Sequence, residues 1–79
     1  MKLVLYAIKD TVGEEFGPIF GAKNDATAYR SFAQTMADNK YPQEFLLHSV
    51  GTYNTETGII EAFPQPQTLK VIDMTEKEI

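Results

Sequence analysis

Few residues in this sequence have the side chains and spacing that acid–base or nucleophilic chemistry requires. His48 is the only histidine, and the chain has no cysteine. Ser31 and Ser49 belong to no motif that would activate a hydroxyl. The adjacent carboxylates Glu14 and Glu15 fall in a polar turn, without the apolar cleft that tunes such pairs for catalysis. We therefore expect a protein that is not an enzyme and has no catalytic residue.

The same scarcity limits metal and cofactor binding. A single histidine without cysteines cannot build a histidine- or cysteine-based metal site. No loop gathers carboxylates at the spacing that a calcium site uses. The sequence predicts neither a bound metal nor a cofactor.

A different chemistry, base stacking, is open to the four tyrosines and five phenylalanines. Aromatic side chains on a sheet can stack unpaired bases when Lys or Arg lies nearby. The start of a capped helix also attracts phosphate through its backbone N–H groups. The candidate nucleic-acid-binding residues are Lys9, Lys23, Arg30, Tyr41 and Tyr53. On residue types alone, a role of these aromatic residues in the core and in a subunit interface is favoured over base stacking.

The clearest element is a helix from about residue 25 to residue 38. Asn24 is a good N-cap, and Asp25 in the first turn suits the positive helix end. Asn39 is predicted to end the helix in a left-handed conformation, and Pro42 prevents its continuation. The residues that form an apolar stripe at helical spacing are Ala28, Tyr29, Phe32, Ala33 and Met36.

Two strands are predicted before the helix. Residues 2–9 are apolar on both faces, which indicates a central strand covered on both sides. Residues 10–17 read as a polar turn, and residues 18–23 as an antiparallel second strand with Pro18 at its start. Gly21 is typical of a bulge or a close backbone approach.

A hairpin is predicted after the helix, from residues 44–54 and 58–63. Its turn begins with Asn54 and ends with Gly58, as longer hairpin loops often do. Gly51 again indicates a bulge or a close backbone approach.

The C-terminal part is predicted to leave this sheet. The prolines in residues 64–67 lack N–H groups and should end the strand. Residues 69–74 form either an edge strand or an extended arm, and residues 75–79 a frayed tail. The prediction is one α+β domain over residues 1–74, with an antiparallel sheet and one helix in the order β-β-α-β-β and a fifth strand as an option.

One helix covers only one face of a sheet, so the two-faced first strand needs a second cover. Either the sheet curls into a small barrel, or a second copy packs on the open face. A chain of 79 residues also buries a modest core, and here no disulfide supplements it. We therefore expect a homo-oligomer, with a dimer favoured.

The formal net charge of −4 argues against a surface that coats phosphates, unless the charges are segregated. The apolar run in MKLVLYAIKD is too short for a membrane span or a signal peptide. We expect a soluble intracellular protein with no membrane partner.

Three segments carry a likeness that covers most of the chain: KLVLYAIKD, FGPIFGAKNDATAYRSFAQTM, and FLLHSVGTYNTETGIIEAF with its proline-rich exit. In this order, they resemble the small nonstructural protein of gokushovirus-type microviruses, which are tailless phages with single-stranded DNA genomes. The resemblance implies a non-capsid protein made in the cytoplasm of the infected bacterial host. Members of that family are described as DNA-binding, in genome synthesis or in delivery of the genome to the procapsid.

Two functions follow as hypotheses. The first is non-enzymatic binding of single-stranded DNA, sensitive to salt and lost on replacing Arg30 and Lys23. The second is an oligomeric protein-interaction module that joins phage replication or packaging proteins, through an apolar sheet face or edge and without DNA contact.

Overall fold

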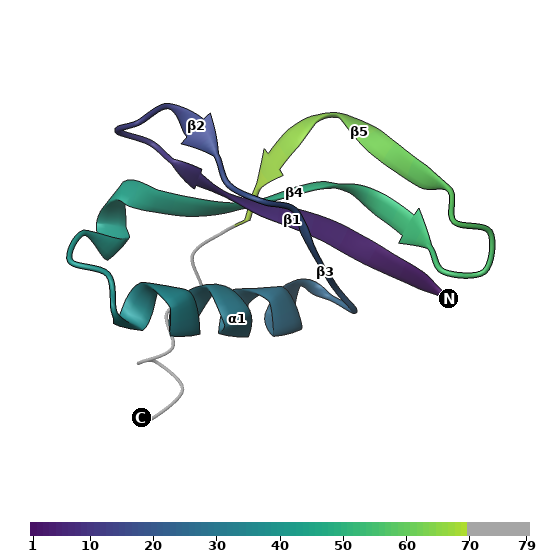
Figure 1. Ribbon diagram of the computed structural model, residues 1–79, viewed down its shortest axis with the longest axis horizontal. Helices are drawn as coiled ribbons and strands as arrows, with labels where there is room; N and C mark the ends of the chain where they lie inside the picture. Colours follow the sequence, from purple (N-terminus) through teal and green to yellow (C-terminus); the bar gives the residue numbers. More distant parts are fainter. Residues whose placement is uncertain (70–79) are drawn as a thin grey trace.

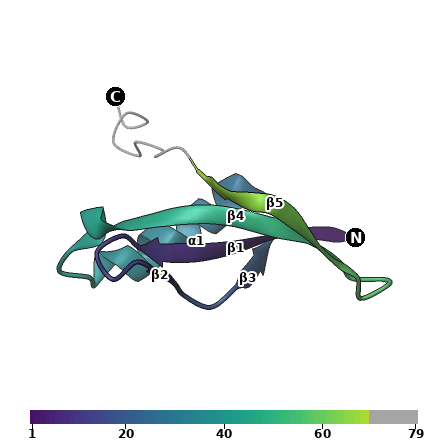
Figure 2. The same cartoon turned by 90° about the horizontal axis from the view of Figure 1, so that it is seen from above.

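The computed structural model describes residues 1–69. They form an antiparallel sheet with one helix packed on one of its faces (Figure 1). Its elements are β1 (Lys2–Asp10), β2 (Glu15–Phe16), β3 (Phe20–Ala22), α1 (Asp25–Ala37), the 3-10 helix η1 (Pro42–Glu44), β4 (Phe45–Asn54) and β5 (Ile60–Thr68). The sheet order is β2-β1-β4-β5, and β3 also pairs with β1. Figure 2 shows α1 running along β1 and β4. The predicted α+β class is confirmed.

The first strand is central, as predicted. Along one edge, β1 pairs with β4 from Lys2 opposite Asn54 to Asp10 opposite Phe45. Along its other edge it pairs with the two short strands β2 and β3. Apolar residues on both faces of β1 therefore reflect its position in the middle of the sheet.

The helix begins where its capping residue predicts. Asn24 is extended, and its side chain accepts a hydrogen bond from the Thr27 N–H at 2.9 Å. The prediction for Asn39 is wrong, because Glu14 is the only non-glycine residue of the described range with positive φ. The Asn39 N–H instead donates to the Met36 carbonyl at 3.0 Å. This tightened last turn satisfies a carbonyl without a left-handed residue.

The core lies between α1 and the sheet. It consists of the buried residues Tyr6, Ala22, Ala28, Phe32 and Leu47. Tyr29, Met36 and Phe45 are half-buried and pack against it, so most of the predicted stripe is confirmed. Ala33 is exposed, so the predicted stripe is one residue too wide.

The segment after β1 differs from the predicted polar turn. Asp10 Oδ1 accepts hydrogen bonds from the N–H groups of Val12 and Gly13, both at 3.0 Å, which closes the turn early. Glu15 and Phe16 then pair back with β1 as β2. Pro18, predicted at the start of a strand, lies instead between β2 and β3.

The hairpin turn is confirmed, but its second strand is longer than predicted. Asn54 Oδ1 accepts from the N–H groups of Glu56 and Thr57, and Gly58 has a φ of 78°. The strand β5 does not end at residue 63 but continues to Thr68 through both prolines.

A register shift explains why the prolines are tolerated. Gly51 pairs with Ala62, and Ser49 pairs with Gln67, so residues 63–66 bulge between the two pairs. Pro64 and Pro66 fall in this arch on an edge strand, where no ladder N–H is needed (Figure 1). The Leu69 N–H donates to the Leu47 carbonyl at 2.9 Å. The rest of the predicted 69–74 arm and the 75–79 tail lie outside the described residues.

Candidate functional site

The two faces of the sheet differ in what covers them. The helix α1 packs on one face, and no helix among residues 1–69 covers the other, above which β2 and the arch of β5 rise (Figure 1). We call this second face the open face. Directly paired residues point to the same face, which assigns its members from the register. They are Leu3, Leu5, Ala7, Lys9, Phe16, Gly21, Leu46, His48, Gly51, Tyr53, Ile60, Ala62 and Thr68.

An aromatic ring and a cation meet at one end of the open face. The Lys9 ammonium lies 5.6 Å from the centroid of the Phe16 ring. The Phe16 side chain remains accessible to a ligand, because the residue is 42% exposed. This end therefore presents a flat apolar surface beside a positive charge.

His48 supports Phe16 from below. The two rings meet edge-on, with centroids 5.2 Å apart. His48 is buried; its Nε2 lies 2.9 Å from the Thr68 hydroxyl, and its Nδ1 lies 3.4 Å from the Leu46 carbonyl. Both ring nitrogens have partners inside the protein, so we assign His48 a packing role.

A second aromatic residue lies at the other end of the open face. Tyr53 is half-buried on β4 and pairs with Leu3 on one side and Ile60 on the other. Leu3 and Lys9 are six residues apart on β1, which corresponds to roughly 20 Å along a strand. The two aromatic positions mark the ends of this face. Between them, Leu5 is half-buried, and Ala7 and Gly51 are buried.

The carboxylates of the strands belong to the other face. Asp10 pairs with Phe45 and with Glu15, and Phe45 packs against the core under α1. Glu61 pairs with Thr52, on the face opposite to Tyr53 and Gly51. Among the paired strand residues of the described range, the open face thus carries Lys9 and no carboxylate. A net charge of −4 is compatible with a local surface that does not repel phosphate.

The five predicted nucleic-acid-binding residues do not form one cluster. Lys9 and Tyr53 share the open face. Lys23 lies between β3 and α1, Arg30 on α1, and Tyr41 just before η1, all three exposed. Arg30 therefore belongs to the helix that covers the opposite face.

Sequence reasoning did not select Phe16. It falls in a segment that reads as a polar turn, and two residues are too few for a strand to show an alternating pattern. The only usable signal was an aromatic residue shortly after the turn that follows Lys9.

Within residues 1–69, no group of three His, Asp or Glu side chains is placed to hold a metal ion. No helix in this range is both long and apolar enough to cross a membrane.

Comparison with known proteins gives one match. The family model described as Phage ORF5 protein matches residues 3–76, which is nearly the whole sequence. No curated protein and no solved structure was found to match. The resemblance of the three sequence segments to a phage protein is confirmed by the family match.

Proposed function

The chain belongs to the phage ORF5 protein family, and we propose that it binds single-stranded DNA on its open face without catalysing a reaction. The observation that carries this proposal is the grouping of Phe16, Tyr53 and Lys9 on a face where the paired strands place no carboxylate. We further propose that it acts in the host cytoplasm during genome synthesis or packaging, as the gokushovirus likeness implies.

The proposed binding mode combines stacking with a phosphate contact. One base stacks on the exposed ring of Phe16 and another on Tyr53, while the Lys9 ammonium contacts a phosphate. Leu3 and Leu5 give the bases between these ends an apolar floor. An interface of roughly 20 Å suits a site on the order of four nucleotides, the short end of the range for stacking platforms.

The test is a titration of a fluorescently labelled oligothymidine, followed by anisotropy in low-salt buffer. We expect Phe16→Ala and Tyr53→Ala each to weaken binding about tenfold, because each removes one stacking platform. Lys9→Gln should lower the slope of log affinity against log salt by about 0.7, the value for one phosphate contact with a single strand. Circular dichroism confirms that each variant is folded.

The matched controls are Arg30, on the helix that covers the opposite face, and Tyr41, which belongs to no strand of the sheet. Arg30→Gln and Tyr41→Ala remove the same kinds of side chain and should change the affinity less than twofold. Two results would contradict the proposal: no binding by the unchanged protein at low ionic strength, or binding that depends on Arg30 and Lys23 but not on Phe16.

A second candidate function is that of an oligomeric protein-interaction module. Ile60 on the open face is 64% exposed, and Leu3, Leu5 and Leu46 there are only half-buried. A second copy packed on this face would bury them. Light scattering should then give a dimer that Ile60→Asp converts to monomer, and a concentration-independent monomer would exclude this mode. If both functions use this face, oligothymidine should dissociate the dimer.

A further inference from the structure

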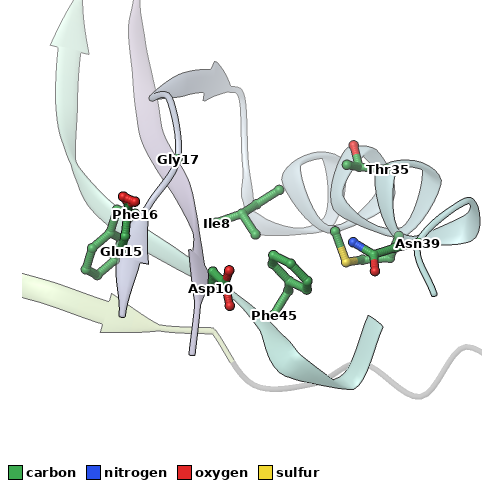
Figure 3. Close-up of a pocket in the computed structure, with 9 residues that line it drawn as sticks. Ile8, Asp10, Glu15, Phe16, Gly17, Thr35, Asn39 and Phe45 are labelled. Carbon is green, nitrogen blue, oxygen red and sulfur yellow. The ribbon is translucent and has the colours of Figure 1, made fainter. Parts of the chain in front are cut away.

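A cleft of about 450 Å³ lies on the helix side of the sheet, between β1, β2 and the C-terminal half of α1. Its apolar lining comes from Ile8, Met36 and Phe45, which are half-buried and pack against the core, and from the exposed Phe16 on β2. Figure 3 shows Ile8, Asp10 and Phe45 on the side of the strands toward α1, with Glu15 at the outer side of β2. The base of the cleft is therefore apolar, and its edge along β1 and β2 is acidic.

The two carboxylates have no cationic partner within the described range. The ion pairs among residues 1–69 join the N-terminus to Glu56 and Lys2 to Glu61, at the hairpin end of the molecule. Asp10 uses only Oδ1 in its two hydrogen bonds to the turn. Its Oδ2 remains able to accept a hydrogen bond from a ligand.

The end of the helix adds to this negative character. The last turn of α1 contains no basic residue, and its C-cap is Asp38. The carbonyl end of a helix carries a partial negative charge, which a cation nearby would stabilise. Thr35 and Asn39, from this part of the chain, also line the cleft.

We propose that the cleft binds an arginine side chain from a basic segment of a partner protein. The aliphatic stem of the arginine lies on Ile8, Met36 and Phe45, and the guanidinium reaches Asp10 and Glu15. A planar guanidinium suits two carboxylates better than an ammonium does, because it offers several donors in a fixed fork. Nucleic acid is disfavoured here, since the same carboxylates repel phosphate.

The cleft meets the proposed DNA interface at Phe16, which lines the cleft and also lies on the open face. Lys9 and Tyr53 do not line the cleft, and Asp10 and Glu15 take no part in the proposed DNA contact. Substitutions at Asp10 and Glu15 therefore test the cleft separately from DNA binding. The proposal also gives the acidic balance of the chain a specific role, as one half of a charge-complementary contact.

The probe is a capped hexapeptide of alternating arginine and leucine, titrated into ¹⁵N-labelled protein and followed by amide chemical shifts. We expect the largest shifts at Ile8, Glu15 and Met36. Asp10→Asn keeps an oxygen acceptor for the turn and removes only the charge, and Glu15→Gln changes an exposed side chain. Each should weaken the peptide about two- to fivefold, the upper part of the range for one exposed charge pair, and the double variant more than either.

Glu56→Gln is the matched control, because it removes one exposed carboxylate at the far hairpin turn. It should change the affinity less than twofold. An equal loss with Glu56→Gln, unchanged affinity in the Asp10→Asn/Glu15→Gln double variant, or shifts confined to the open face would each overturn the proposal. Equal binding of a peptide of alternating glutamate and leucine would overturn it as well.

Discussion

Replacing Tyr6 with alanine is expected to remove most of the stability of the protein. Tyr6 is fully buried, and its ring stacks on Phe20 with centroids 5.7 Å apart. Truncating a buried aromatic side chain costs about 3–5 kcal/mol. Domains have about 5–15 kcal/mol of stability in total, and one of this size lies toward the low end. Urea titration followed by circular dichroism measures the loss, and a midpoint close to that of the unchanged protein would contradict it.

Tyr6→Phe separates the ring from the hydroxyl. The Tyr6 hydroxyl donates a hydrogen bond of 2.7 Å to Asp25 Oδ1 and so ties the central strand to the first turn of α1. Losing this bond should cost about 1.5–3 kcal/mol, the range for a bond to a charged acceptor. The ring still fills its place, so Tyr6→Phe should lose less stability than Tyr6→Ala.

The stability of the unchanged protein and that of Tyr6→Phe can also be compared as a function of pH. Burial, and then the hydrogen bond and the negative charge of Asp25, raise the pKa of the Tyr6 phenol far above its ordinary value of 10.0. Folding therefore favours the neutral phenol. The contribution of Tyr6 to the free energy of unfolding is complete below about pH 10 and is lost as the pH rises beyond it. The unchanged protein should lose stability between pH 10 and 12 more steeply than Tyr6→Phe. Parallel losses would show that Tyr6 does not contribute.

Local signals in the sequence predicted much of this fold. Asn24 marks the start of α1, the turn from Asn54 to Gly58 marks the hairpin, and the apolar residues of β1 mark a central strand. Each of these depends on residues close together in the chain. The course of β5 through Pro64 and Pro66 depends instead on a register shift against β4, which is a tertiary property.

The candidate site was less predictable for a related reason. Both faces of β1 are apolar, so alternation alone cannot say whether α1 covers the face of Tyr6 or that of Leu5. This choice places Lys9 and Tyr53 on the open face and Arg30 away from it. It also separates Asp10 from Lys9, its neighbour in the chain. A net charge cannot reveal such a separation, because it sums over both faces.

Gly51→Ala is expected to detach the first half of β5 from the sheet. A Cβ at this position would clash with the Glu61 carbonyl oxygen and would lie 3.1 Å from the Ala62 Cα. These are backbone atoms of the paired strand, so no side-chain rotation relieves the contact. The cost should be about 1–3 kcal/mol, as for other overpacked sites. The sequence prediction of a close backbone approach at Gly51 is confirmed by this geometry.

Hydrogen exchange measures where the strain is released. The Asn54 N–H bonds the Ile59 carbonyl, and the alternation of an antiparallel ladder then directs the Glu61 N–H to Thr52. In Gly51→Ala, the amides of Asn54 and Glu61 should exchange faster, while those of β1 and α1 stay protected. Gly21→Ala is the matched control, because the tightest contact of its Cβ would be with the flexible end of the Leu3 side chain, at 3.3 Å, and its other near contacts are side-chain atoms at ordinary distances. It should cost less than about 1 kcal/mol. Unchanged protection of β5 in Gly51→Ala would contradict the prediction.

The functional consequence of Gly51→Ala follows from the pairing of Tyr53 with Ile60. Freeing β5 removes the strand beside Tyr53, so this end of the open face loses its support. The Lys9–Phe16 end, held by β1 and β2, does not depend on β5 pairing. Oligothymidine affinity should therefore fall about tenfold, as in Tyr53→Ala, with the salt slope unchanged because Lys9 keeps its phosphate contact. A reduced slope at unchanged affinity would instead place the phosphate contact at the β5 end of the open face.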